Sequence, residues 1–223
     1  RTSYNIAFSY AIDGDGFSID ALRVAVDALV ARHETLRTTF RVPEGGGDPV
    51  QCIHERMPID VALVEVDEAS LPALANAHAA HVFDLVEGPL LKISVARTAP
   101  DRHRFLFNMH HAISDGWSIG VLFRDLHALY VQAAAGQTPQ LPALPMQYAD
   151  YAVWQRGLDI SDDLDYWTSR LKDYEDGISL PYDRERPVGR AWEAAVVHKR
   201  YPPELAARVA ACSGGSGVGR GCG

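Results

Sequence analysis

Two adjacent histidines, His110 and His111, are followed four positions later by Asp115 and then by Gly116. An imidazole gains and loses a proton near neutral pH, so a histidine that faces a cavity is a candidate general base. Neighbouring residues at a strand end point to opposite faces, so we expect one histidine to be held in the protein layer while the other projects into a cavity. Asp115 would orient the loop, and Gly116 would let a substrate approach the backbone.

A helix predicted to begin near Trp117 adds a second chemical feature to this stretch. Its unpaired N–H groups and the positive end of its dipole would point toward the same place, which suits a developing oxyanion and therefore an acyl-transfer reaction. A purely structural interpretation competes with this one. In it, Asp115 only caps the helix, His110 is a core histidine with a backbone partner, and Trp117 is a packing residue.

Metal binding fits the histidines less well. Joint ligation by His110 and His111 is awkward because the two side chains leave opposite faces of a strand end. His78 and His81 have helical spacing, but no carboxylate accompanies them in the sequence. We therefore predict no metal site.

A serine hydrolase is a further alternative. Residues 116–120 have the GxSxG pattern of a nucleophile elbow around Ser118, and Asp183 and His198 follow in the order that such a triad requires. An elbow comes directly after its strand, whereas residues 112–115 separate the strand end from the glycine here. The hydrolase interpretation is therefore the less favoured one.

Apolar periodicity predicts alternating strands and helices along the chain. The first strand is expected around residues 4–8 and should end at the turn formed by residues 13–16. Further strands are expected near residues 38–42, 50–53, 59–66, 90–95, 103–110 and 196–201. Helices are expected near residues 20–33, 71–82, 117–135, 148–155 and 164–172, and from residue 203 onward. Glycine occupies six of the eleven residues 213–223, so the last helix is not expected to extend into this tail.

Composition restricts the classes of function. The formal net charge is −8, from 21 Lys and Arg against 29 Asp and Glu, and no basic patch interleaved with aromatic residues stands out, so nucleic acid is not an expected partner. No apolar run is long enough for a membrane span, and the opening residues do not form a signal peptide, so we expect a cytoplasmic protein. Three scattered cysteines do not suggest a disulfide framework.

Several motifs in order resemble those of the condensation domains of nonribosomal peptide synthetases. Residues 109–118, MHHAISDGWS, resemble the HHxxxDG signature of that family. Residues 32–40, RHETLRTTF, resemble its RHExLRTxF segment, and residues 148–155, YADYAVWQ, resemble its YxDYAxWQ segment. The similarity runs from about residue 4 to residue 211.

The resemblance implies a fold and a domain organisation. The fold would be an α/β class, an α+β two-layer sandwich, in which a mixed sheet covered by helices forms one chloramphenicol-acetyltransferase-like lobe. Residues 1–211 would be the N-terminal lobe of a condensation domain, and residues 212–223 a glycine-rich tail outside the family pattern. The C-terminal lobe and the far wall of the tunnel between the lobes would be missing.

The resemblance also implies a reaction. Donor and acceptor carrier proteins would insert phosphopantetheine arms into the tunnel, and the acceptor amine would attack the donor thioester to form an amide, as in the biosynthesis of peptide antibiotics or siderophores. The domain itself would bind no cofactor. His111 would be the base or the positioner of the amine, with His110, Asp115 and Gly116 completing the catalytic motif.

Supporting roles follow from the same family motifs. Asp115 would be braced by an arginine, with Arg32 as the first candidate and Arg37 as the second. Trp117 and Trp154 lie in the matching segments as further supporting residues. Taken alone, the chain would be inactive and could self-associate through the face that the second lobe would cover. A noncatalytic remnant that docks a carrier protein is the alternative from another functional class.

Overall fold

The computed structural model describes residues 2–174, 181 and 199–215. The chain divides into two compact units, residues 1–175 and residues 176–223. The first unit carries the sheet and most of the helices. The second unit contributes the described helix α6 (Pro203–Gly215).

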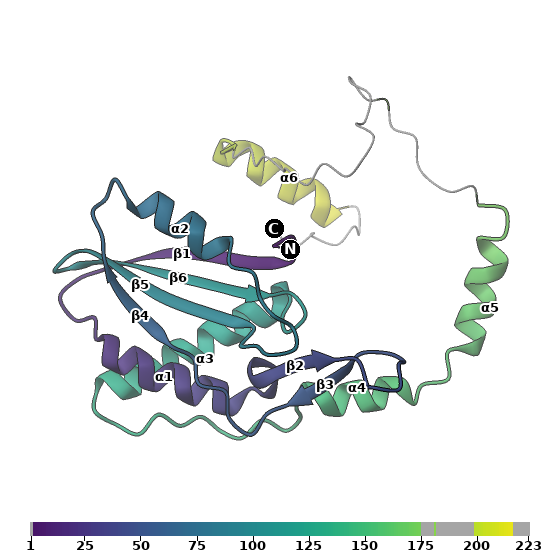
Figure 1. The fold of residues 1–223 in the computed structure, drawn as a ribbon. Coiled ribbons are helices and arrows are strands. Elements are labelled where there is room, and N and C mark those ends of the chain that lie inside the picture. The colour runs from purple at the N-terminus through teal and green to yellow at the C-terminus, as the bar shows by residue number, and fades with distance from the viewer. Residues whose placement is uncertain (1, 175–180, 182–198, 216–223) are drawn as a thin grey trace. The chain divides into compact units, whose positions relative to one another are not determined.

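A four-stranded mixed sheet forms the centre of the first unit (Figure 1). Its strands, in spatial order, are β1 (Asn5–Asp13), β6 (Arg102–His110), β5 (Leu91–Ala99) and β4 (Val61–Glu65). Only the β4–β5 pair is parallel, while β1–β6 and β5–β6 are antiparallel. A separate antiparallel hairpin consists of β2 (Thr38–Arg41) and β3 (Val50–Ile53).

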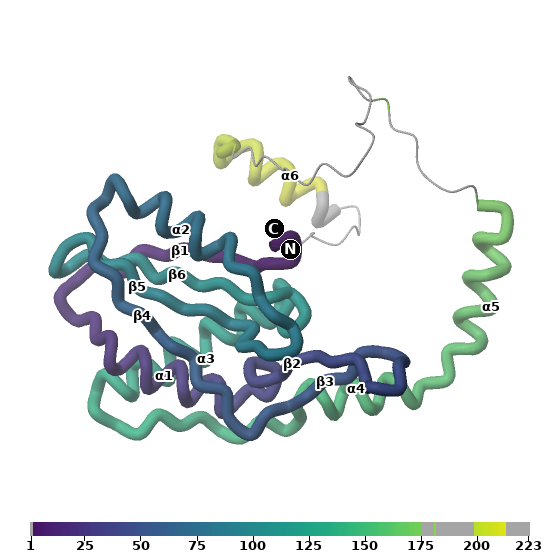
Figure 2. The backbone as a smooth tube through the Cα atoms, viewed as in Figure 1, coloured from purple at the N-terminus to yellow at the C-terminus, as the bar shows by residue number. Residues whose placement is uncertain are grey.

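The first unit contains the helices α1 (Ile19–Arg32), α2 (Leu71–Ala79), α3 (Gly116–Ala134), α4 (Tyr148–Arg156) and α5 (Ser161–Arg170), and the 3₁₀ turn η1 (Glu34–Arg37). Three of these helices, α1, α2 and α3, cover the two faces of the sheet (Figure 1). Helices α1 and α3 lie side by side on one face, and α2 lies on the other over β1 and β6 (Figures 1 and 2). The hydroxyl of Tyr130 on α3 accepts a hydrogen bond from the backbone N–H of Ser18 at the start of α1 (3.0 Å).

Alternation along β6 decides which residues reach each layer. Phe105 and Phe107 face α3, where their rings lie 6.2 and 5.2 Å from that of Phe123. Asn108 faces α2 instead, and its side-chain amide donates to the carbonyl of His78 (2.7 Å). His110, two residues further, belongs to the same face as Asn108. The strand therefore turns His110 toward the face of the sheet that α2 covers. His111 lies beyond the end of the strand and can enter another environment.

The structure confirms most of the predicted elements and corrects three of them. Strand β1 ends at Asp13, at the turn that was predicted to end it. Helix α2 ends at Ala79 rather than near residue 82. Helix α6 extends to Gly215, so the prediction that the glycine-rich tail could not continue it is wrong. Residues 196–198 of the predicted strand 196–201 lie outside the described residues, and residues 199–201 do not form a strand.

Helix α2 carries a buried histidine. His78 is 6% exposed, and its Nε2 atom has no hydrogen-bond partner within the described chain. Burial, with a smaller effect from the charge of Lys92, lowers the pKa of His78 to about 4. None of the helices within the described residues is long and apolar enough to span a membrane.

Stability should fall with acid because of His78. In the unfolded chain this imidazole takes up a proton near its ordinary pKa of about 6.5, whereas in the folded chain it resists protonation until about pH 4. Above pH 6.5 the imidazole is neutral in both states and does not lower the free energy of unfolding. As the pH falls from 6.5 toward 4, this free energy decreases by roughly 3 kcal/mol at most. Denaturant unfolding between pH 7 and 4 would show a shallower decline for His78→Leu. The control, His127→Leu, removes an exposed imidazole and should keep the wild-type decline.

Candidate functional site

The backbone fixes the position of both histidines of the predicted motif. At the end of β6 the N–H of His110 donates to the carbonyl of Leu90 (3.0 Å). The N–H of His111 donates to the carbonyl of Tyr4, just before β1 (2.8 Å). The loop that follows β6 is therefore anchored to chain segments on both sides of the strand.

His110 is half-buried on the face of β6 that also carries Asn108. Its Nδ1 atom accepts a hydrogen bond from the backbone N–H of Ala112 (3.1 Å), which assigns the ring proton to Nε2 in the neutral form. The rings of Tyr4 and Phe83 lie 6.1 and 6.4 Å away. Burial, followed by the neighbouring charge of His111, lowers the pKa of His110. A neutral His110 therefore fixes the turn.

His111 is exposed and lines a cavity of about 200 Å³. No hydrogen bond engages its ring among the described residues, so both ring nitrogens are available to a ligand. The cavity walls come from the loop after β6, the start of α3, the β2–β3 hairpin, η1 and α4. The other residues that line it are Thr35, Thr38, Phe40, Gln51, Ala112, Ile113, Ser114, Asp115, Ser118 and Tyr148.

Asp115 is the N-cap of α3. One carboxylate oxygen accepts hydrogen bonds from the backbone N–H of Ser118 (2.8 Å) and from its hydroxyl (2.6 Å). These two bonds, with the hydroxyl contributing most, lower the pKa of Asp115, so the carboxylate stays ionised. The carboxylate occupies part of the helix N-terminus that the sequence suggested for an oxyanion.

The arginine brace predicted for Asp115 is wrong in both of its versions. Arg32 donates from Nε to the carboxylate of Asp125 on α3 (2.9 Å). Arg37 donates to the carboxylate of Glu34 (3.2 Å) and to the carbonyl of His54. Within the part of the chain that is described, no arginine or lysine forms an ion pair with Asp115. The observed role of the Asp115 carboxylate is to cap the N-terminus of α3.

Ser118 does not have the geometry of a nucleophile elbow. It lies inside α3, several residues after β6 ends, and its hydroxyl donates to the carboxylate of Asp115 rather than to a histidine. Asp183 and His198, which would complete a triad, lie outside the described residues.

Three further predicted residues lie on exposed surface. A Cβ added at Gly116 would have no atom within 4 Å, so the backbone there is open to an approaching group. Trp117 is 82% exposed, which contradicts the structural interpretation of this residue as a packing residue. Trp154 on α4 is also exposed, and its ring lies 5.4 Å from that of Tyr151.

Sequence reasoning missed two residues whose side chains bind the last residue of α1, Asp125 and Gln147. Asp125 carried a signal, because it lies between Leu122 and Leu126 on the apolar stripe of α3, where a charge is unexpected unless it is paired. Gln147 carried none, since it follows a connection without periodicity. No group of three or more His, Cys, Asp or Glu side chains that could hold a metal occurs in the described ranges.

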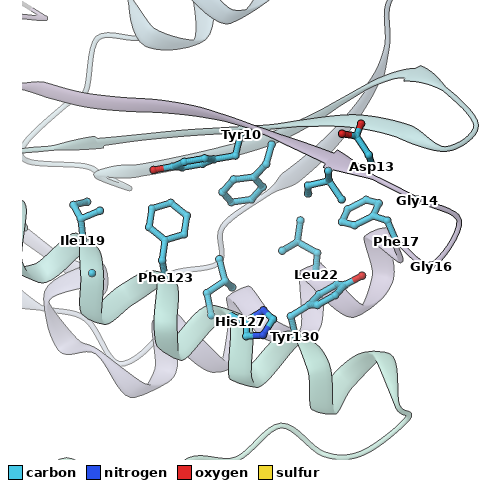
Figure 3. A pocket seen from close by; sticks show the side chains of 14 residues that line it. Tyr10, Asp13, Gly14, Gly16, Phe17, Leu22, Ile119, Phe123, His127 and Tyr130 are labelled. Atoms are coloured by element: carbon cyan, nitrogen blue, oxygen red, sulfur yellow. The ribbon is translucent and has the colours of Figure 1, made fainter. Parts of the chain in front are cut away.

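A larger apolar groove of about 790 Å³ lies elsewhere, between β1 and helices α1 and α3 (Figure 3). Its walls include Tyr10, Phe123 and Tyr130, which Figure 3 shows lining the groove. None of the site residues predicted from the sequence lines it. His111 and Asp115 of the motif line the smaller cavity, and that cavity is therefore the candidate site.

Comparison with known proteins gives consistent matches over most of the chain. The family model described as "Condensation domain" matches residues 1–218. A linear gramicidin synthase of Brevibacillus parabrevis is 37% identical over 217 residues, which cover 92% of this chain and 3% of that protein. Phosphinothricin tripeptide synthetase PhsC of Streptomyces viridochromogenes is 39% identical over 218 residues, covering 92% of this chain and 20% of that protein.

Solved structures match the fold. The complex of the X-domain and OxyB from teicoplanin biosynthesis contains a chain with a TM-score of 0.83 and 30% identity, covering 97% of this chain and 49% of that one. The starter condensation domain of rhizomide synthetase RzmA gives a TM-score of 0.68 at 19% identity, covering 78% and 44%. The expected chloramphenicol-acetyltransferase-like α/β fold is confirmed. The chain spans about half the length of these solved relatives and a small fraction of the curated ones.

Capping by Asp115 can be separated from its charge. Asp115→Ala should lower the free energy of unfolding by about 1 kcal/mol, because α3 loses its N-cap acceptor. Asp115→Asn should cost less, since an asparagine side chain caps a helix about as well. Urea denaturation of the purified chain measures both. Equal losses for the two variants would show that charge, and not capping, determines the contribution.

Proposed function

Because the chain belongs to the condensation-domain family of nonribosomal peptide synthetases, we propose that the cavity beside His111 is where a donor acyl or peptidyl thioester reacts with an acceptor aminoacyl thioester. The observation that carries the proposal is the placement of His111. Its ring lines the cavity and is exposed, while His110 is engaged in the layer behind it. This placement supports a division of labour in which only His111 meets the substrates.

The reaction needs no covalent intermediate on the protein. The nitrogen of the acceptor amine attacks the donor carbonyl carbon, the new C–N bond forms, and the C–S bond breaks. The proton lost by nitrogen ends on the released thiol of the donor arm. His111 removes that proton or positions the amine, because an imidazole with free ring nitrogens can do either.

The substrates would arrive on two carrier proteins, each bearing a phosphopantetheine arm. When the donor and acceptor arms are held in one cavity, the bimolecular reaction between the two thioesters becomes effectively unimolecular. Residues 1–223 contribute one set of walls to such a site. This chain covers 49% of a chain in the solved X-domain complex. We propose that the remainder of such a domain is also needed to align both arms and exclude water. We expect it to act in the cytoplasm.

His111→Ala should lower amide formation by roughly a hundredfold or more, as expected when a positioned acid–base group is lost. The assay uses a complete domain in which this chain is joined to the C-terminal half of a relative, with both carriers loaded and product measured by mass spectrometry. The matched control is His127→Ala, which replaces an exposed histidine of α3 that does not line this cavity. This variant should retain activity.

Carrier binding distinguishes this proposal from a docking module. The His111→Ala domain should still bind both loaded carriers, because the ring faces the reacting ends of the arms. A wild-type domain that binds carriers but yields no amide would favour the noncatalytic alternative. Labelling of Ser118 by a fluorophosphonate would favour the hydrolase.

Gly116→Ala tests the approach of substrate to the backbone. The added methyl group meets no protein atom within 4 Å, so folding should be unchanged. If a substrate passes close to this residue, the methyl group will raise KM or lower kcat at least severalfold in the same assay. Gly120→Ala, also without a neighbour within 4 Å, is the control. Identical kinetics for both variants would show that the substrate does not approach Gly116.

A further inference from the structure

A buried carboxylate joins α1 to α3. The side chain of Asp125 is 6% exposed. It accepts hydrogen bonds from Nε of Arg32 (2.9 Å) and lies 3.0 Å from Nε2 of His33, while Arg124 contacts it from the surface (3.1 Å). A carboxylate taken out of water is tolerated only with partners of this kind. The end of α1 is therefore fixed to the middle of α3.

The same cluster extends to the segment that precedes α4. Arg32 also donates a hydrogen bond to the carbonyl of Pro142. The carbonyl of Arg32 accepts from Nε2 of Gln147 (3.0 Å), and Oε1 of Gln147 accepts from the backbone N–H of Glu34 (3.2 Å). A single glutamine side chain thus bridges the last residue of α1 and the first residue of η1.

These bridges end where the cavity wall begins. Thr35 on η1, Thr38 at the start of β2 and Tyr148 at the start of α4 all line the cavity that His111 faces. Tyr148 follows Gln147 directly, and α4 contacts η1. His111 itself is anchored through β1 and β6, which belong to the sheet. The wall and the histidine are consequently carried by different parts of the fold.

We propose that Asp125 and Gln147 are positioning residues, which hold the wall formed by η1, β2 and α4 at a fixed distance from His111. This inference rests on the proposed function. Neither side chain lines the cavity, so both act through the residues they hold. A reaction between two bound thioesters is sensitive to such spacing, because a displacement of about 1 Å can cost on the order of a hundredfold in rate.

The principal test is Gln147→Ala in the complete domain described above. The substitution removes both bridging hydrogen bonds at a half-buried position, so the domain should still fold. We expect kcat for amide formation to fall about tenfold, with KM for each loaded carrier changed less than about threefold. Asp125→Asn should show the same split with a larger loss in kcat.

Arg124→Ala is the matched control. It removes one partner of the same carboxylate, but Arg124 is exposed. Among the described residues, no hydrogen bond or ion pair joins its side chain to η1 or to the segment before α4. Its kcat should stay within about twofold of wild type. The proposal is overturned if folded Gln147→Ala retains wild-type kcat, or if activity in all three variants simply follows the melting temperature. Should Asp125→Asn fail to fold, Gln147→Ala alone decides.

A second measurement separates this inference from the proposed function. In the 223-residue chain, backbone amide NMR signals of Thr35 and Thr38 should shift in Gln147→Ala and remain in place in Arg124→Ala. Unchanged signals in both variants would refute the positioning role even if the wild-type domain forms amides. Shifted signals together with an inactive wild-type domain would support the positioning role and refute the proposed reaction.

Discussion

The contact between the buried carboxylate of Asp125 and the guanidinium of Arg32 is the interaction on which the site depends. Burying either charge alone would be strongly destabilising, so the two helices that carry them can pack only in the register that joins them. Helix α3 also begins at the cavity, and α1 leads directly into η1 and the β2–β3 hairpin. This ion pair therefore joins the helix that begins at the cavity to the helix that leads into the cavity wall.

The histidine pair divides two tasks that a single residue could not perform. His110 is desolvated and neutral, and its Nδ1 atom is committed to the turn, which makes it a rigid support. His111 has its backbone held by the carbonyl of Tyr4 and leaves its ring free. Alternation at a strand end is sufficient to produce this division. The support and the reactive group are adjacent in sequence, yet they belong to different environments.

Periodicity predicted the existence and type of most elements, because apolar faces at helical or strand spacing have few other solutions. One histidine of the motif was also predicted to be held in the protein layer and the other to face a cavity. The partner of Arg32 was predicted wrongly, since a contact 93 residues away leaves no local trace, and only the charge of Asp125 within an apolar stripe hinted at it. Helix α6 passed its predicted end because glycine lowers helix stability by about 1 kcal/mol without forbidding the helix.

Helix α3 contains both the N-cap beside the cavity and, further along, the carboxylate of Asp125. Each residue added to a helix turns everything beyond it by about 100° and shifts it by about 1.5 Å. A single insertion between Asp115 and Asp125 would therefore swing the carboxylate away from Arg32. The length of this part of the chain is consequently fixed, whereas the glycine-rich turn at residues 45–47, where added side chains meet nothing within 4 Å, can vary in length without disturbing either end of the site.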